Sequence, residues 1–336
     1  MRLHGRGDDD LRGRPRRRTA GTDPPDARSR ARLSTPPVSA RTSPWPGIAL
    51  AAFGAIAFSG KAIIVKLGYR YGADAITLLA LRMLFALPFF LAMAAWARRR
   101  AERPRIGARD GWRIAALGFF GYYLASFLDF AGLAHVSATL ERLILYLTPT
   151  IVLLIGYFVF KRAATPRQLV ALVVSYAGVL LAFAHDVRVG GGDIVLGSAL
   201  VFASAVSYAI YLVGSGELVA RVGAMRLTAY ASSVACVLCI GQYLLLRPWH
   251  GLASLPEPVL WLSLLNGTLC TVVPVLAVMM AIERIGSGLA AQVGMLGPVS
   301  TIVLSLVLLD EPMGPWQVAG TALVLVGVLV LSSVRR

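Results

Sequence analysis

Five ionisable side chains lie within stretches of the sequence that are otherwise apolar: Lys61, Arg82, Asp129, Glu141 and Arg142. A charged side chain at the centre of a membrane helix costs about 2.5–3.5 kcal/mol on insertion scales, so each one needs a compensating role. The set holds three cations and two anions. If the five side chains line one cavity, its surplus of positive charge favours a substrate with an anionic or zwitterionic group.

The same side chains allow two other interpretations. Opposite charges within the set can pair and fasten four helices together, or Glu141 and Arg142 can extend to the lipid headgroups from the end of their helix. These two residues are adjacent, so on a helix they point about 100° apart and do not easily share one partner. A buried carboxyl group binds a proton more readily than one in water, so Asp129 or Glu141 could also couple transport to a proton gradient.

The segments that must position these residues are long enough to cross a membrane. The chain is 57% hydrophobic and only 15% charged, unlike a soluble globular domain. Its apolar segments are mostly uncharged and nearly all reach the length of a membrane helix, which argues against the alternating strands of an outer-membrane barrel. Ten spans are predicted, at about residues 47–69, 74–97, 112–133, 138–160, 166–184, 195–214, 225–246, 258–281, 288–309 and 316–333.

The sequence repeats itself at a distance of 149 positions. Pro149, Pro166, Gln168 and Gly178 match Pro298, Pro315, Gln317 and Gly327. Each copy holds five spans, an odd number, so the second copy must be inverted in the membrane. The predicted fold is therefore an all-α polytopic membrane protein of ten transmembrane helices in two inverted five-helix repeats, at 46–184 and 195–334, an architecture used by transporters.

The five charges belong to the first repeat alone. At offsets of 149 to 151, the second repeat has uncharged residues in their place: Leu212, Ser233, Val278, Ala290 and Ala291.

Lysine and arginine in the loops predict the orientation. With the amino terminus inside, the inward loops hold 15 of these residues and the outward loops only four: Lys66, Arg70, Arg188 and Arg247. Both termini are then cytoplasmic, in the inner (plasma) membrane. Residues 1–45 contain eleven arginines and few large apolar residues, so we expect a disordered cytoplasmic tail. The net charge of +16 thus reflects orientation, and no nucleic-acid partner is expected.

Prolines and a few polar residues are further cavity candidates. A proline inside a helix removes a backbone donor and frees a carbonyl group, which is tolerated in a membrane where the backbone lines a cavity. Pro149 and Pro298 occupy equivalent places in the repeat, so we expect both to be helix breaks that line the cavity symmetrically. The weaker cavity candidates are Tyr208, Tyr211, Asn266 and Gln292. The pair Cys236 and Cys239 lies in mid-helix without histidine or acidic neighbours in the sequence, which favours packing over redox or zinc chemistry.

Three stretches of the chain resemble the EamA-type branch of the drug/metabolite transporter superfamily. They are FSGKAIIVKLGYRYGADAITLLALRMLFALPFFL, GYYLASFLDFAGLAHVSATLERLILYLTPT and LGPVSTIVLSLVLLDEPMGPWQVAGTALVLVGV. The resemblance covers about residues 47–333 and implies a ten-helix carrier, but it does not indicate the substrate. That family commonly ends its fourth and ninth spans with a Gly-Glu type turn. Here the first copy has Lys161-Arg162, and only the second has acidic residues, Asp310-Glu311.

Together these features predict a secondary transporter, and not an enzyme. The sequence has none of the common hydrolase, ATP-binding or metal-binding motifs, so no cofactor and no metal are expected. The expected activity is export or exchange of a small polar metabolite by alternating access, with protons as a further candidate partner. Two alternatives stay open. A lipid-carrier flippase would need a lateral apolar opening and a basic headgroup site, and a scaffold protein without transport would satisfy its polar groups internally.

Overall fold

The computed structural model describes residues 44–99, 106–161, 165–190, 192–248, 251, 255–294, 296–311 and 314–333. These residues form helices joined by short turns, and no strand occurs among them. The predicted tail, except its last two residues, lies outside the described residues. In chain order the helices are α1 (Trp45–Arg70), α2 (Ala75–Arg99), α3 (Ala108–Gly118), η1 (Phe119–Leu124), α4 (Ala125–Leu133), α5 (Ala138–Leu145), α6 (Thr148–Phe160), α7 (Pro166–Gly190), α8 (Gly192–Val222), α9 (Ala224–Leu246), α10 (Glu257–Gly267), η3 (Thr268–Val272), α11 (Val273–Gly294), α12 (Leu296–Leu308) and α13 (Pro315–Ser333).

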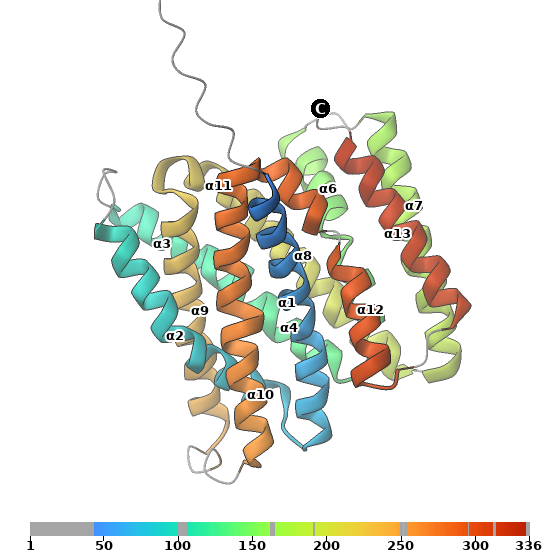
Figure 1. Ribbon diagram of the computed structural model, residues 1–336, viewed down its shortest axis with the longest axis horizontal. Helices are drawn as coiled ribbons and strands as arrows, with labels where there is room; N and C mark the ends of the chain where they lie inside the picture. The colour runs from blue at the N-terminus through green and yellow to red at the C-terminus, as the bar shows by residue number, and fades with distance from the viewer. Residues whose placement is uncertain are drawn as a thin grey trace, which may run out of the picture. The chain divides into compact units, whose positions relative to one another are not determined.

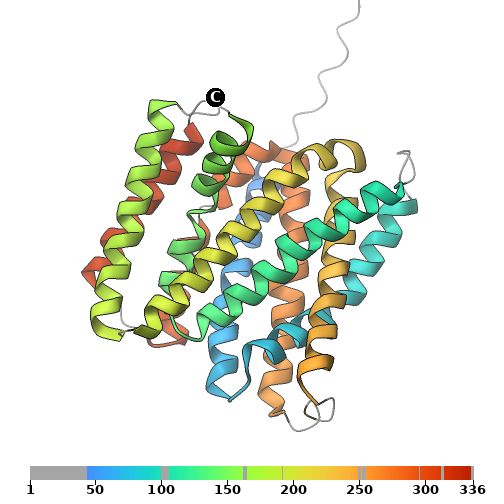
Figure 2. The same cartoon turned by 180° about the vertical axis from the view of Figure 1, so that it is seen from behind.

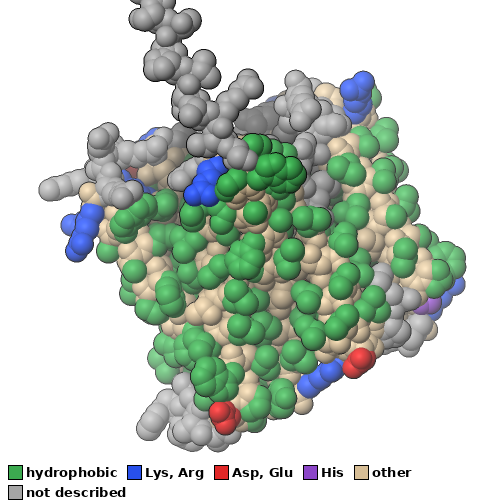
Figure 3. Space-filling view, viewed as in Figure 1, with side chains coloured by type: hydrophobic (Ala, Val, Ile, Leu, Met, Phe, Trp, Pro, Cys, Tyr) green, Lys and Arg blue, Asp and Glu red, His purple; other side chains and the backbone are tan. Residues whose placement is uncertain are grey.

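The helices confirm the prediction of a multi-pass membrane protein. Among the described residues, eight helical segments are long and apolar enough to cross a membrane, and two shorter apolar helices, Leu296–Leu308 and Pro315–Val330, complete a set of ten. Figure 3 shows apolar side chains over the lateral face, with charged side chains gathered towards its two ends. This distribution suits a protein whose sides meet hydrocarbon and whose ends meet water.

The start of the ninth span is a predicted boundary that is clearly wrong. Residues 288–294 do not open that span but continue α11, and α12 begins only at Leu296. The reason is Pro298, which lacks a backbone donor and is therefore tolerated in the first turn of a helix but not further along. Apolar composition alone runs on through this junction, so hydropathy could not locate it.

The helices pair across the two repeats in an inverted arrangement. Helices α1 and α8 occupy matching places in the two repeats, and so do α11 and α4. Helix α1 lies against α11, and α8 lies against α4 (Figures 1 and 2). The second and seventh spans, α2 and α9, lie against each other, as do the fifth and tenth, α7 and α13. Such reciprocal pairs are what a two-fold axis in the membrane plane produces.

Irregular backbone features also recur in pairs. Among the described residues, positive φ occurs at Gly72 (80°) and Gly223 (94°), and outside glycine at Lys161 (51°) and Asp310 (54°), which are 149 positions apart. The π-helical segments η1 and η3 begin at residues 119 and 268, again 149 apart. We use the two glycines to name the faces of the molecule. The Gly72 end holds the turns after α1, α4 and α12, and the Gly223 end holds the turns after α6 and α8.

Two glycines mark close helix crossings that correspond in the two inverted repeats. A Cβ atom at Gly118 in α3 would lie 2.6 Å from the carbonyl oxygen of Ala231 in α9, and one at Gly267 in α10 would lie 2.6 Å from that of Arg82 in α2. Only glycine lets two backbones approach so closely. The two crossings hold the first half of α2, which begins at the Gly72 end, and the first half of α9, which begins at the Gly223 end.

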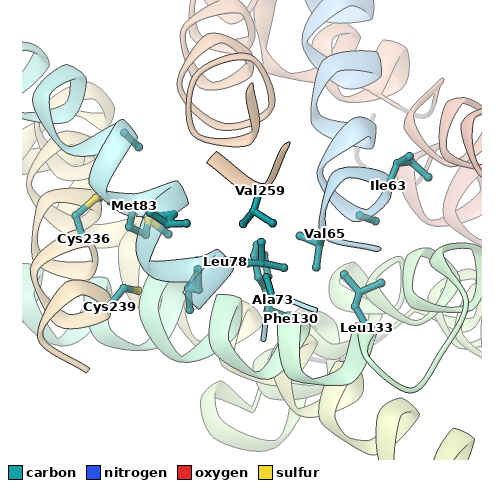
Figure 4. Packing of buried hydrophobic residues seen from close by; sticks show 14 of the residues in the cluster. Ile63, Val65, Ala73, Leu78, Met83, Phe130, Leu133, Cys236, Cys239 and Val259 are labelled. Carbon is teal, nitrogen blue, oxygen red and sulfur yellow. Dashed lines mark hydrogen bonds between the residues drawn. The ribbon is translucent and has the colours of Figure 1, made fainter. Parts of the chain in front are cut away.

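The largest apolar core fills the space between α1, α2, α4, α9 and α10. Figure 4 shows Val65, Leu78, Phe130 and Val259 converging, with Met83 beside Cys236. Phe130 is fully buried and Leu78 nearly so. This core packs around the helices that carry the charged residues of the first repeat and holds these helices in place.

Candidate functional site

A cavity of about 450 Å³ lies at the centre of the helices. Four charged side chains line it: Lys61 from α1, Arg82 from α2, Asp129 from α4 and Arg142 from α5. Aromatic residues form much of the remaining wall, among them Phe58, Phe90, Tyr122, Tyr146 and Tyr208. The site is therefore amphipathic, with its charge confined to one part of an otherwise apolar chamber.

Lys61 joins two carboxylates. Its Nζ atom donates to Asp129 Oδ2 and, at 3.2 Å, to Glu141 Oε1. All three side chains are buried, and Glu141 is fully enclosed without lining the cavity. Glu141 thus supports Lys61 from behind, whereas Asp129 faces the cavity. The aromatic ring of Phe58 lies 5.7 Å from the Lys61 ammonium and gives it a further favourable contact.

A break in the fourth span brings Glu141 and Arg142 to this place. Helix α5 starts at the N-cap Ser137, whose hydroxyl accepts from the Leu140 amide, and it ends after two turns. Pro149 stands in the first turn of α6, so the helix cannot run through. The hydroxyls of Thr148 and Thr150 donate to the carbonyl oxygens of residues 145 and 147, at 2.6 Å each. The bond from Thr148 satisfies the Leu145 carbonyl group, which Pro149 leaves without an amide donor, and the bond from Thr150 adds to the backbone bonds of the Leu147 carbonyl.

Two arginines are each held by a threonine of the second repeat. Arg82 Nε donates to Thr271 Oγ1 at 2.8 Å, and Arg142 Nε donates to Thr301 Oγ1 at 3.1 Å. Each guanidinium also lies over an aromatic ring, that of Phe130 at 5.2 Å for Arg82 and that of Phe58 at 5.6 Å for Arg142. The hydrogen bond at Nε therefore fixes the orientation of each guanidinium group.

The outer donors of both guanidinium groups have no partner. Within the described part of the chain, Arg82 Nη1 and Arg142 Nη2 are buried and make no hydrogen bond. An unsatisfied buried donor is costly, more so when it is charged. A carboxylate or phosphate group in the cavity would satisfy such donors, since guanidinium geometry matches these anions.

Of the four weaker cavity candidates, only Tyr208 is described as lining the cavity. Tyr208 lines the cavity, while Tyr211 lies behind it, stacks on Tyr208 and shares a hydrogen bond of 3.1 Å with the hydroxyl of Tyr122. Asn266 is buried and does not line the cavity; its backbone carbonyl accepts from Thr271. The side chain of Gln292 lies outside the described residues.

The two prolines also differ, although both stand in the first turn of a helix. Pro149 lines the cavity, whereas Pro298 is buried in the packing of α12 and is absent from its wall. The reason is close packing beside it: the hydroxyl oxygens of Tyr146 and Ser59 lie 3.2 Å and 3.4 Å from the position of a Cβ atom on Gly297.

Sequence reasoning missed the residues that orient the charged groups. Thr271, Thr301 and Phe58 contact Arg82, Arg142 or Lys61 but carry no charge. Threonine is common in membrane helices, so its type alone gave no signal. Among the described residues, no group of three or more His, Cys, Asp or Glu side chains is arranged to hold a metal ion.

The Gly72 end is tied shut by polar contacts. Glu311 lies 3.6 Å from the Lys66 ammonium and accepts from the Ala138 amide at 3.1 Å, and Arg70 donates to the carbonyl oxygen of Leu309. These contacts join α1 and α5 to the turn that follows α12. Burial raises the pKa of Glu311 above its ordinary value, although the charge of Lys66 opposes the shift.

Two matching positions at the Gly223 end have open space beside them among the described residues. Val65 and Ser305, near the Gly72 end, are almost fully buried. Their counterparts are Gly216 and Gly156, where a Cβ atom would meet no atom within 4 Å. The two ends therefore differ in packing although their backbones correspond.

These features define a class: an all-helical, multi-pass membrane protein built from two inverted five-helix repeats around a polar site in a central cavity. The model of the EamA-like transporter family matches residues 45–184 and 195–333. The chain belongs to the EamA-like transporter family.

Relatives and a solved structure agree with this assignment. The chain is 31% identical over 281 residues to the uncharacterized transporter YcbK of Bacillus subtilis, covering 80% of this chain and 86% of that protein. It is 24% identical over 277 residues to an uncharacterized transporter of Archaeoglobus fulgidus, covering 82% and 93%. A crystal structure superposes with a TM-score of 0.59 at 20% identity, over 86% of this chain and 97% of that one, which shows a shared fold.

Proposed function

We propose that the chain is a secondary transporter that moves a small organic anion or zwitterion by alternating access. The observation that carries this proposal is the pair of buried guanidinium groups whose outer donors, Arg82 Nη1 and Arg142 Nη2, are unpaired beside a cavity. A scaffold protein without a substrate gains nothing from leaving such donors unsatisfied. An anionic group of the substrate satisfies them when it binds.

The difference between the two ends supports alternating access. The Gly72 end is closed by the contacts of Lys66, Arg70 and Glu311, while at the Gly223 end the described residues leave open space beside Gly156 of α6 and Gly216 of α8. Because the repeats are inverted, exchanging their local packing would close the Gly223 end and open the other. Transporters with inverted repeats move between two such states around a fixed site.

The orientation belongs to the same proposal. The Gly72 end faces outward, both termini lie in the cytoplasm, and the membrane is the inner (plasma) membrane, because the basic loops are those of the Gly223 end. A reporter enzyme that is active only outside the cytoplasm, fused after Arg247, gives activity, and the same reporter fused after Arg336 gives none. The reverse pattern contradicts this orientation.

Asp129 is the candidate for coupling to protons. It lines the cavity, whereas Glu141 is fully enclosed, so a proton that enters from the cavity reaches Asp129 first. Protonation of Asp129 would remove the negative charge beside Lys61, so the positive charge of the site would attract an anion more strongly. Because protonation would favour binding of the anion, proton and anion would cross together, and exchange of one anion for another would proceed without net proton movement.

Transport by reconstituted protein tests the proposal. Proteoliposomes are loaded with a panel of radiolabelled organic acids and amino acids, and exchange is measured for the wild type, Arg82→Gln and Arg142→Gln. Arg247→Gln is the control, since Arg247 pairs with Asp74 on the exposed surface of the Gly72 end. We expect exchange of at least one anion by the wild type and the control, and its loss in both cavity variants. Equal exchange in all four proteins would refute the anion site.

A further inference from the structure

A second cavity, of about 430 Å³, lies between α2, α9 and α11. It is lined by apolar side chains, among them Phe89, Met93 and Trp96 of α2, Met225 of α9, and Met279 and Met280 of α11. Among the side chains that the structure describes, none that lines it is charged. Trp96 and Met280 are more than 40% exposed, so the cavity opens sideways, towards hydrocarbon in a membrane.

The divergence of two helices creates this side cavity. Helix α2 lies against α10 and η3, where Gly267 allows the close approach to the Arg82 carbonyl oxygen. From that crossing α2 and α11 move apart towards the Gly223 end, as Figures 1 and 2 both show. Pro88 lies inside α2 and Pro274 begins α11 just beyond the crossing, and both disrupt regular helix hydrogen bonding there. The prolines of both helices thus favour the divergence that opens the side cavity.

The walls of the side cavity and the central one share two described side chains. Phe90 and Val275 line both cavities. Phe90 is eight residues from Arg82 on α2, about 12 Å along a helix. A molecule whose anionic group meets Arg82 could therefore place an apolar chain of moderate length past Phe90 and between α2 and α11.

We propose that the side cavity accommodates the apolar chain of an amphipathic organic anion whose carboxylate is bound by Arg82 and Arg142. The two cavities have complementary properties: the central one holds the cationic donors, and the adjoining one offers only apolar contacts. Methionine side chains are flexible and polarisable, so the four methionines of the wall adapt to chains of different shape. This inference rests on the proposed function, and it narrows the substrate to anions with an alkyl or similar apolar chain.

Binding of straight-chain carboxylates to the full-length protein in lipid nanodiscs tests the inference. We expect dodecanoate to bind more tightly than octanoate, and octanoate more tightly than butanoate, by about fourfold for each methylene group that becomes buried. Protein-free nanodiscs correct for partition into lipid. Because 12-bromododecanoate places a heavy atom at the chain end, it should quench the fluorescence of Trp96, and Trp96→Phe should remove that quenching.

Adjacent substitutions on α2 provide a matched pair. Ala92 lines the side cavity, whereas its neighbour Leu91 does not and is exposed on the lateral surface. Ala92→Phe should fill the cavity and weaken dodecanoate binding at least tenfold, while butanoate binding stays unchanged. Leu91→Phe should leave the binding of both carboxylates as in the wild type.

The outcomes separate this inference from the proposed function. If no carboxylate binds, or if binding is unaffected by Arg82→Gln, the anion site itself is absent. If butanoate binds through Arg82 but chain length and Ala92→Phe have no effect, the anion site stands and the side-cavity inference is overturned. Quenching of Trp96 by phospholipids brominated in their acyl chains, without relief by dodecanoate, would assign the cavity to a bilayer lipid and also overturn it.

Discussion

Among the described residues, the charged side chains that line the central cavity all come from the first repeat, whereas the second repeat supplies hydroxyl groups that hold the two arginines. Arg82 and Arg142 come from α2 and α5, and their Nε partners Thr271 and Thr301 come from η3 and α12. The backbones do not share this division, because π-helical segments, helix crossings and positive φ values recur in both repeats.

The contrast shows which property of an inverted repeat must be symmetric. Alternating access requires two related packings of the helices, and these depend on where the backbone bends and where two helices touch. Recognition of one ligand requires a single set of donors, which need not be repeated. Substitutions that act on the backbone should therefore have similar effects in both repeats, and substitutions in the charged set should not.

Lys61→Met should have the largest effect. It leaves Asp129 and Glu141 buried without their shared cation, and breaking a buried pair costs about 3–5 kcal/mol. The yield of folded protein in detergent should fall sharply, whereas Leu212→Met, the substitution at the matching position of the second repeat, should change it little. Normal folded yield and normal transport in Lys61→Met would contradict the role of Lys61.

Asp129→Asn should act on transport more than on folding. Asparagine keeps the shape of the side chain, and Lys61 retains Glu141 as its partner at 3.2 Å. Loss of a charged hydrogen bond at the cavity wall corresponds to roughly a tenfold to hundredfold fall in transport rate. The measurement pairs the transport rate with the amount of detergent-stable protein. A parallel fall in both would show that the charged cluster only fastens the helices.

Gly118→Ala and Gly267→Ala should destabilise the protein by similar amounts. In each case the new methyl group would lie 2.6 Å from a carbonyl oxygen of a neighbouring helix, so the helices must move apart. Overpacking of this kind costs about 1–3 kcal/mol. Thermal unfolding in detergent measures both variants. Gly241→Ala is a control, because its Cβ atom would meet no described atom within 4 Å. A large effect in one repeat and none in the other would show that the two helix crossings are not equivalent.

Lys161→Gly and Asp310→Gly should have the smallest effects, and both should be stabilising. Each residue has φ near 50° after the end of a helix, a conformation that glycine adopts without the cost of about 1–2 kcal/mol that other residues incur. Part of that gain is offset because glycine is more flexible in the unfolded chain. An increase in the unfolding temperature of only one variant would show that the two turns are not equivalent.

The sequence was sufficient for the number of spans and their inversion, but not for the junction between the eighth and ninth spans. Hydropathy and repeat spacing carry this information, and four of the five charged residues, Lys61, Arg82, Asp129 and Arg142, do line one cavity. Spacing gives depth along a helix but not the direction in which a side chain points. For that reason it did not distinguish Glu141, which is enclosed, from Asp129, or separate Tyr211 and Asn266 from Tyr208.

The threonine partners and the side cavity were beyond the sequence for a related reason. Thr271 and Thr301 matter only because particular arginines lie opposite them, and that depends on how the repeats interlock. The side cavity depends on the angle between α2 and α11. A proline such as Pro88 or Pro274 indicates a disrupted helix, but not the direction in which two helices diverge.

The three cysteines give the molecule a means of reporting its own movements through chemical labelling. Cys236 and Cys239 in α9, and Cys270 in η3, are free thiols with almost no exposed surface. The sulfur of Cys236 lies 3.7 Å from that of Met83 in α2, and Cys270 lies against Gly60 of α1. Any rearrangement that separates α9 from α2, or η3 from α1, uncovers a thiol. The rate at which a maleimide reacts with the native protein should therefore follow the opening of these helices, with no engineered label required.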